Sequence, residues 1–250
     1  MKESAKPAMQ TAFIVRRKTL IVDLGSPRCV LSSAPRAGGI TWARYILNHQ
    51  VANNPISRDN CATGAIKRCG DPSRMLSKLA TSLGIREKFV GLMTAVSLAD
   101  FVAIRAASDH IWVEGFVTVG TANAVRAGET AEPRQLTNGR TDPGTINVIL
   151  VTNARLPASA MVGMVQVATE AKTAVLLHAK VKSWTGRSRA TGTGTDAVVV
   201  VGGNGPYMRY SGTHTVIGEL VGRVVETAVT EGLARYRRRQ APPVSHTKHL

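Results

Sequence analysis

A bend of alternating threonine and glycine, followed at once by a run of valines, constrains this chain more than any other feature. Residues 190–196 read Ala-Thr-Gly-Thr-Gly-Thr-Asp, and residues 197–201 read Ala-Val-Val-Val-Val. A short run of β-branched apolar residues after turn residues is typical of a buried strand. Glycines in the bend let the backbone approach a ligand, and the threonine and aspartate side chains add polar groups beside it. The stretch therefore predicts a buried strand with a polar entrance, which is a suitable place for an active site.

Before residue 153, most of the chain alternates short apolar runs with turn residues. We predict strands at residues 11–15, 19–24, 29–33, 41–51, 89–96, 101–106, 111–119 and 145–152, and a short helix at 72–83. The first two strands are close enough along the chain to form a hairpin. Residues 53–74 and 128–144 carry proline, glycine and polar residues without an apolar rhythm, and predict surface loops.

Two long helices are predicted in the C-terminal half. Residues 157–180 begin with proline and place apolar residues on one stripe, and residues 213–236 repeat apolar residues at spacings of three and four. Clusters of strands followed by helices favour an α+β fold. We expect a single domain in which a largely antiparallel or mixed sheet packs against these two helices. Residues 11–236 would form this domain, residues 1–10 a frayed N-terminus and residues 237–250 a basic, disordered tail.

The chain is strongly basic. Thirty-two Lys and Arg residues against sixteen Asp and Glu residues give a formal net charge of +16, which attracts polyanions. The basic residues are scattered, however, and aromatic residues, which stack on bases, make up only 4% of the chain. We therefore expect a solvated basic surface rather than a nucleic-acid partner. The sequence gives no reason for the size of the charge.

Neither a membrane segment nor a metal site is predicted. No apolar run approaches the ~20 residues that span a bilayer, and the N-terminus has no long apolar leader. The three cysteines form no CxxC pair and lie far from any closely spaced histidine pair. We expect a cytoplasmic protein without a membrane partner, a metal or a cofactor, and we leave its oligomeric state open.

Residues 192–197 match a loose form of the dinucleotide-binding fingerprint. That fingerprint requires a strand before the glycines and a helix after them, whereas here a helix precedes them and a strand follows. The bend can instead bind a ligand through backbone N–H groups and hydroxyls, which Gly192, Gly194, Thr193 and Thr195 supply. Asp196 either orients a base or water for catalysis, or only accepts hydrogen bonds from turn amides.

His214 lies at the start of the second long helix, where Ser211 or Thr213 can cap the helix end. The positive end of the helix dipole disfavours an imidazolium, so this histidine would be neutral near pH 7 and able to accept a proton. Unpaired N–H groups beside it, near Gly212, could hold an oxyanion. The alternative is a histidine that only caps the turn.

Lys172 emerges from the apolar stripe of the first long helix. Its amine must therefore reach solvent, pair with a carboxylate or serve a ligand. Glu170 points about 200° away around an ideal helix, so at most one of the two residues contacts a substrate.

Several short polar side chains adjoin predicted strands. Asn123 and Asn147 could bind polar substrate groups through their amides. Ser32 and Ser33 precede a glycine-rich turn, but no G-x-S-x-G elbow surrounds either residue, so no serine-hydrolase triad is predicted.

A family resemblance spans residues 30–225 and rests on eight segments in a fixed order. They are Leu31-Ser-Ser-Ala34 with Gly38-Gly39, Asn48–Val51, Val90–Val96, Val119-Gly-x-x-Asn123-Ala124, Gly144–Asn147, Glu170-Ala-Lys172, Ala190–Asp196, and Tyr210-x-Gly-Thr-His-Thr215 with Gly218-Glu219. Together they resemble the adenosylcobinamide amidohydrolase family (CbiZ). The chain departs from the family at Ile40, where a third glycine often follows Gly38 and Gly39, and in its basic tail.

The resemblance implies hydrolysis of the amide that joins the corrin ring's f side chain to aminopropanol, giving adenosylcobyric acid in corrinoid salvage. The corrinoid is then the substrate and not a cofactor. The catalytic group would comprise His214 and Asp196 for proton transfer, Lys172 or Glu170 in support, and water as nucleophile in preference to a hydroxyl such as Thr193 or Thr195. The substrate-binding group would comprise Ser32, Ser33, Gly38, Gly39, Asn123, Asn147, Gly192, Gly194, Gly212 and Glu219, with backbone N–H groups near Gly192, Gly194 and Gly212 holding the oxyanion.

Three alternatives stay open. The chain could be a corrinoid carrier without activity, or a nucleic-acid-binding module that uses the basic charge. A metal-assisted route through Asp196, His214 and Glu219 is also open, although their spacing matches no known ligand signature. The catalytic assignment depends on one expectation, which is that the 190–196 bend and His214 meet in a single pocket.

Overall fold

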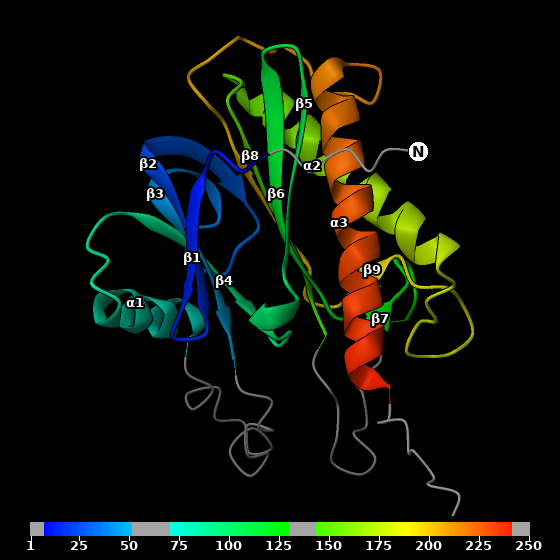
Figure 1. The fold of residues 1–250 in the computed structure, drawn as a ribbon. Coiled ribbons are helices and arrows are strands. Elements are labelled where there is room, and N and C mark those ends of the chain that lie inside the picture. Colours follow the sequence, from blue (N-terminus) through cyan, green and yellow to red (C-terminus); the bar gives the residue numbers. More distant parts are fainter. Residues whose placement is uncertain (1–7, 52–70, 131–143, 242–250) are drawn as a thin grey trace, which may run out of the picture.

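A computed structural model describes residues 8–51, 71–130 and 144–241. These residues form one mixed sheet with helices against it, in agreement with the predicted α+β class (Figure 1). The strands are β1 (Ala12–Arg16), β2 (Thr19–Ser32), β3 (Gly39–Gln50), β4 (Phe89–Thr94), β5 (Val102–Ser108), β6 (Ile111–Val119), β8 (Ile146–Thr152) and β10 (Ala197–Val201), in the spatial order β4-β3-β2-β10-β8-β6-β5 with β1 paired to β2. Two strand pairs, β3–β4 and β8–β10, are parallel, and the other pairs are antiparallel.

The sheet is strongly curved, since Asn48 on β3 contacts Thr118 on β6, which lies four strands away in the sheet order, and the β2–β3 pair is irregular in the middle. The register of the pair shifts between Asp23 and Arg28, so the first half of β2 pairs with β1 while the second half pairs with β10. The predicted separate strand at 29–33 is therefore wrong, since these residues continue β2 after an irregularity.

The two faces of the curved sheet bury different apolar clusters. On the outer face, alternate residues such as Val148, Leu150 and Val200 contact the long helices. On the inner face, Ile149 and Val199 pack against the β2, β3 and β4 strands on the opposite side of the curve. Because both faces of β8 and β10 are buried, these strands are continuous apolar runs in the sequence.

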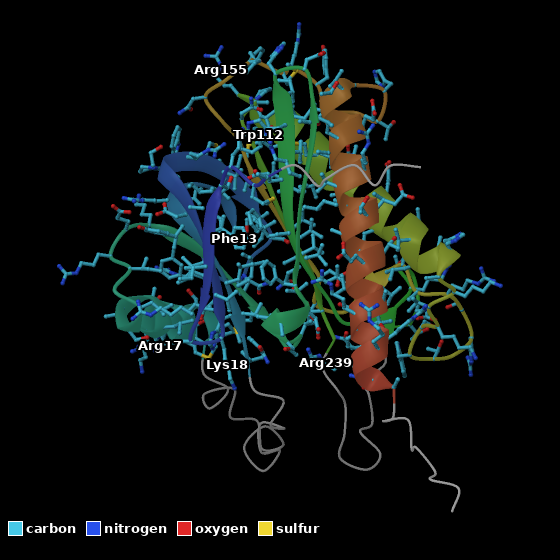
Figure 2. All side chains as sticks on the ribbon, viewed as in Figure 1. Phe13, Arg17, Lys18, Trp112, Arg155 and Arg239 are labelled. Carbon is cyan, nitrogen blue, oxygen red and sulfur yellow. The ribbon has the colours of Figure 1, made fainter. Side chains whose placement is uncertain are left out.

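The N-terminal strand covers the open side of the curve. Phe13 on β1 makes edge contacts with Phe101 and Phe116, with ring centroids 5.9 and 5.2 Å away (Figure 2). Just before β1, the backbone N–H of Thr11 donates to the buried carboxylate of Glu114 on β6 at 3.0 Å. The predicted β1–β2 hairpin is confirmed, and it joins the two sides of the curve.

Helices α2 (Ala158–His178) and α3 (Val216–Gln240) lie side by side on the outer face and run in the same direction. At their N-terminal ends the Ser211 hydroxyl donates to the carbonyl of Ala160 at 2.6 Å, and at their C-terminal ends Arg237 donates to the carbonyl of Ala179 at 2.9 Å. Because β8, α2 and β10 form a parallel crossover unit, the starts of β8 and β10 lie at the end of the molecule where α2 finishes.

Among the described residues, α2 has the length and hydropathy of a membrane-spanning helix, with a mean hydropathy of 1.3. A buried core helix passes the same test, and Met161, Met164 and Leu176 of α2 are almost fully buried against the rest of the domain.

The remaining helix predictions hold with shifted ends. Helix α1 (Pro72–Ser82) begins after Asp71, whose side chain accepts a hydrogen bond from the Ser73 N–H. Helix α3 extends four residues beyond the predicted end at Tyr236, through arginines that suit a helix C-terminus.

Three short elements were not predicted. They are the strands β7 (Ala124–Val125) and β9 (Gly192–Thr193), which pair with each other, and the 3₁₀ turn η2 (Leu98–Asp100). Most of the predicted 53–74 and 128–144 loops, and residues 242–250 of the predicted tail, lie outside the described residues. The prediction of a disordered tail from residue 237 is wrong for residues 237–240, which belong to α3.

Candidate active site

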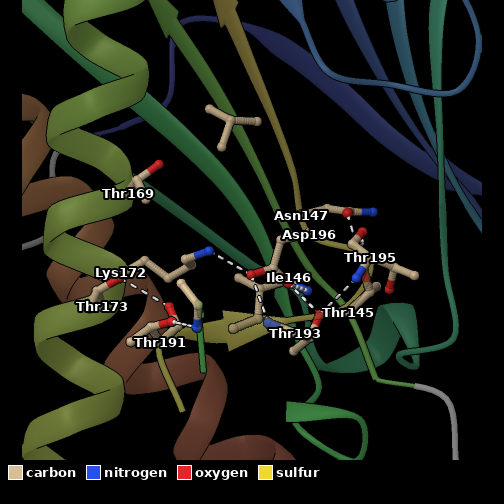
Figure 3. Close-up of polar contacts among 12 residues, drawn as sticks. Thr145, Ile146, Asn147, Thr169, Lys172, Thr173, Thr191, Thr193, Thr195 and Asp196 are labelled. Carbon is tan, nitrogen blue, oxygen red and sulfur yellow. Dashed lines mark hydrogen bonds and ion pairs between the residues drawn. The ribbon is translucent and has the colours of Figure 1, made fainter. Parts of the chain in front are cut away.

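Asp196 organises the polar bend between β9 and β10 (Figure 3). Its Oδ1 atom accepts hydrogen bonds from the Ile146 N–H at 2.9 Å and from the Thr193 hydroxyl. Its Oδ2 atom accepts from the Thr193 N–H at 3.0 Å and from Lys172 Nζ at 2.5 Å. A carboxylate has about four acceptor positions, so these contacts occupy them all. Asp196 thereby joins the bend to the start of β8 and to α2.

Lys172 reaches this carboxylate from α2 and is only 7% exposed. Gly192 leaves the space that the ammonium needs, since a Cβ there would lie 3.1 Å from Nζ and 2.6 Å from Asp196 Oδ2. Within the described part of the chain, Asp196 is the one acceptor that the structure gives the three N–H groups of this ammonium. Glu170 is exposed, as expected of the opposite face of the helix, so Lys172 alone of the two belongs to this centre.

Thr195 in the bend and Thr145, just before β8, both donate their hydroxyls to backbone carbonyls. The Thr145 hydroxyl donates to the Thr195 carbonyl at 2.9 Å, and the Thr195 hydroxyl donates to the Gly144 carbonyl at 3.1 Å. Thr195 is exposed whereas Thr193 is buried. Of the two hydroxyls, Thr195 is therefore the one that a ligand can reach directly.

Asn147 is used inside the protein rather than at the surface. Its Nδ2 donates to Asn48 Oδ1 at 3.0 Å and to the Met93 carbonyl at 2.8 Å, and both asparagines are 1% exposed. Asn48 in turn donates to the Thr118 hydroxyl at 3.3 Å. This network joins β3 and β4 to β6 and β8 across the inside of the curve, so Asn147 supports the floor of the site.

Asn123 lies on the other side of the bend, just before β7. Ala124 pairs with Thr193, and the Asn123 amide nitrogen lies 3.9 Å from the place where a Cβ of Gly194 would be. The Asn123 Oδ1 atom is buried and has no hydrogen-bond partner among the residues that the structure describes. Of the residues predicted to bind substrate, Gly192 therefore adjoins the Lys172–Asp196 pair, and Asn123 and Gly194 lie next to each other at the bend.

The serine and glycine turn before β3 lies one strand away from the bend. Ser33 exchanges hydrogen bonds with Val198 on β10, two residues beyond Asp196, and Ser32 caps the turn by accepting from the Ala34 N–H at 2.8 Å. Gly39 has a φ of +83°, which favours glycine, and Gly38 packs against the Ala34 carbonyl. This turn is near the candidate site but does not contact Asp196.

His214 lies at the far end of the helix layer. Ser211 contacts Ala160 in the first turn of α2, whereas Lys172 lies twelve residues further along, or ~18 Å at the helical rise. Gly212 and Glu219 lie at this same end, and Glu219 is exposed and paired with Arg223. The expected single pocket of bend and histidine is therefore wrong. The same separation removes a shared metal site of Asp196, His214 and Glu219.

Hydroxyl groups of residues 183–188 bind the Glu129 carboxylate and hold this loop beside β7 and β9. The Glu129 carboxylate accepts hydrogen bonds from Ser183, Thr185 and Ser188 at 2.7, 2.8 and 2.5 Å, and from the Arg126 N–H at 3.1 Å. The Ser188 and Ser183 hydrogen bonds, which stabilise the charged form, lower the pKa of Glu129 to about 2. We call these four side chains the Glu129 clip.

The sequence did not predict that the Thr145 hydroxyl and the Ile146 N–H donate hydrogen bonds to the bend. Both lie in the Gly144–Asn147 segment of the resemblance, where Asn147 was selected because its amide is the more obvious ligand group. A backbone donor at the start of a strand has no signature in the sequence, because its availability depends on the neighbouring strand.

The arrangement suits chemistry at a carbonyl group. A buried ammonium with two uncommitted N–H groups can stabilise negative charge on oxygen or deliver a proton, and the carboxylate that orients it is fully hydrogen-bonded. In the described residues, no cluster of three His, Cys, Asp or Glu side chains could hold a metal ion.

Comparisons with known proteins agree with the resemblance. The family model described as adenosylcobinamide amidohydrolase matches residues 3–241. An adenosylcobinamide amidohydrolase of Methanosarcina mazei is 29% identical over 208 residues, which cover 78% of this chain and 86% of that protein. An uncharacterised protein of Methanocaldococcus jannaschii is also 29% identical, over 89% of this chain and 88% of its own length. A solved L-aminopeptidase D-Ala-esterase/amidase of Ochrobactrum anthropi aligns with a TM-score of 0.40 and 10% identity, over 90% of this chain and 83% of that chain.

Proposed function

Since the chain belongs to the adenosylcobinamide amidohydrolase family, and is thus a hydrolase of carbon–nitrogen amide bonds, we propose that it hydrolyses adenosylcobinamide to adenosylcobyric acid and aminopropanol. The bond broken is the amide between the corrin f side chain and aminopropanol. The observation that supports the proposal is the buried Lys172–Asp196 pair within the Thr-Gly bend, because an oriented ammonium can stabilise negative charge on an amide oxygen.

In the proposed mechanism, Lys172 is the proton donor. Its ammonium donates a hydrogen bond to the amide oxygen and stabilises the negative charge that develops as water adds to the carbonyl carbon. As the C–N bond breaks, the aminopropanol nitrogen takes a proton from Lys172, and the proton lost by the attacking water restores the ammonium. Asp196 acts as a positioning residue, because its four hydrogen bonds hold Lys172 and the bend together.

The neighbouring polar groups would bind the rest of the substrate. Exposed Thr195, the backbone at Gly194 and the Asn123 amide border the bend, and the turn at Ser32–Gly39 lies one strand away. A corrin ring carries several amide side chains, which such donors and acceptors can bind.

The test is to incubate the purified protein with adenosylcobinamide and to measure aminopropanol and adenosylcobyric acid. We expect the wild-type protein to release both products. Lys172→Met should lower the turnover rate by about 10²-fold or more, because the proton donor is removed. His214→Ala serves as the matched comparison and should keep near-normal turnover, since His214 lies at the other end of α2. A loss of similar size in His214→Ala would place the chemistry elsewhere, and corrinoid binding without aminopropanol release would indicate a carrier.

A further inference from the structure

A groove of about 320 Å³ lies at the C-terminal end of α3. Its lining consists of Asp100, Arg235, Arg238 and Arg239, and we call it the arginine groove. Figure 2 places Arg239 at the end of α3. Three guanidinium groups thus share one groove with one carboxylate, in a volume at the lower end of those of small-molecule sites, ~300–1,000 Å³.

Two of the arginines are held in place by protein acceptors. Arg239 makes two hydrogen bonds to Asp100, of which the Nη2–Oδ1 bond is 2.8 Å long, and the hydrogen bond raises the pKa of Arg239. Arg235 donates to the Phe101 carbonyl at 2.7 Å and to Glu231 at 2.6 Å. An arginine oriented in this way loses less conformational entropy when it binds an anion.

The third arginine provides the uncommitted charge. Arg238 is exposed, lines the groove, and has no ion-pair partner among the residues that the structure describes. A helix C-terminus stabilises nearby cations, which accounts for basic residues in the last turn of α3. It does not account for three guanidinium groups around one cavity, and this arrangement is suited to the tetrahedral oxygens of a phosphate.

The groove borders the same end of the sheet as the Lys172–Asp196 pair. Tyr236 on α3 approaches to 3.5 Å from where a Cβ of Gly120 would be. The Gly120 N–H donates to the Thr145 carbonyl at 2.9 Å, and Thr145 contacts Thr195 in the bend. A ligand in the groove would therefore lie at the end of the molecule that also holds the candidate active site.

We infer that the arginine groove binds the phosphate group of a small ligand. The site accounts for a part of the basic charge to which the sequence assigned no role. Two sources share this chemistry, namely a free phosphate compound and a phosphate carried by the corrinoid substrate. The second source rests on the proposed function, whereas phosphate binding itself does not.

The deciding experiment is calorimetric titration of the full-length protein with inorganic phosphate, at low and at moderate salt. We expect binding that weakens with salt, and about tenfold or more weaker binding for Arg238→Ala, because a charge-assisted hydrogen bond is lost. Arg223→Ala is the matched control, since Arg223 is an exposed arginine of the same helix that pairs with Glu219 at its other end. Wild-type affinity in Arg238→Ala, equal weakening in Arg223→Ala, or no binding by the wild type would each overturn the inference.

A second arm separates the sources. With an adenosylcobinamide carrying a phosphate ester on the aminopropanol hydroxyl, Arg238→Ala should raise KM for this substrate and leave kcat and the unphosphorylated substrate unchanged. If the ligand is instead a free phosphate compound, the variant should treat both substrates alike and lose only the response to added phosphate. An enzyme that hydrolyses neither substrate but still binds phosphate would contradict the proposed function and leave the phosphate site standing.

Discussion

At the scale of single residues, the buried Lys172–Asp196 pair should contribute both to the stability of the fold and to activity. Removing one partner leaves an uncompensated buried charge, so Lys172→Met and Asp196→Asn should each lower the free energy of unfolding by about 3–5 kcal/mol. The double variant should be closer to wild type than the sum of the single changes, because neither charge is then left without its partner. Turnover should stay low in all three, since each lacks the oriented ammonium. Urea unfolding and aminopropanol release measure the two quantities, and additive losses of stability would mean that the pair is not coupled.

At the scale of elements, the Glu129 clip should make the local stability of residues 183–188 depend on pH. The pKa of Glu129 is about 2 in the folded protein and 4.5 ordinarily, so the clip stabilises the fold fully above pH 4.5 and loses this effect as the pH falls through about 2. Hydrogen exchange should then increase first at residues 183–188, while the amides of β6 stay protected. Glu129→Gln should show the faster exchange already at pH 7 and little further change with acid. Uniform exchange across the domain in that window would contradict this role of the clip.

At the scale of the whole molecule, the polar network between Asn48, Asn147 and Thr118 should help to close the curved sheet. Asn48→Ala leaves one buried Asn147 donor without its acceptor and should cost ~1–3 kcal/mol. For a domain of this size that corresponds to a fall in Tm of roughly 2–4 °C per kcal/mol. Asn204→Ala, at an exposed position, is the matched control and should leave Tm unchanged. Equal Tm values for the two variants in thermal unfolding would show that the network does not stabilise the fold.

Much of the local structure was predictable because it depends on neighbours along the chain. The 3.6-residue period separated buried Lys172 from exposed Glu170, and runs of β-branched residues marked β6, β8 and β10. The errors fell where distant strands decide the outcome. Residues 29–33 belong to β2 because β10 and β3 pair with them, and β7 and β9 exist only because they pair with each other.

The sequence by itself determined the fold class, the helices, and the chemistry available in the bend. Only the tertiary structure decided which distant groups meet there. Asp196 pairs with Lys172 and not with His214, because β8, α2 and β10 form a parallel unit that brings the later turns of α2 to the start of β10. The parallel packing of α3 against α2 places the start of α3 at the other end. Helical and strand periods act over a few residues, whereas strand order and helix direction are set by burial across the whole domain, which no local pattern records.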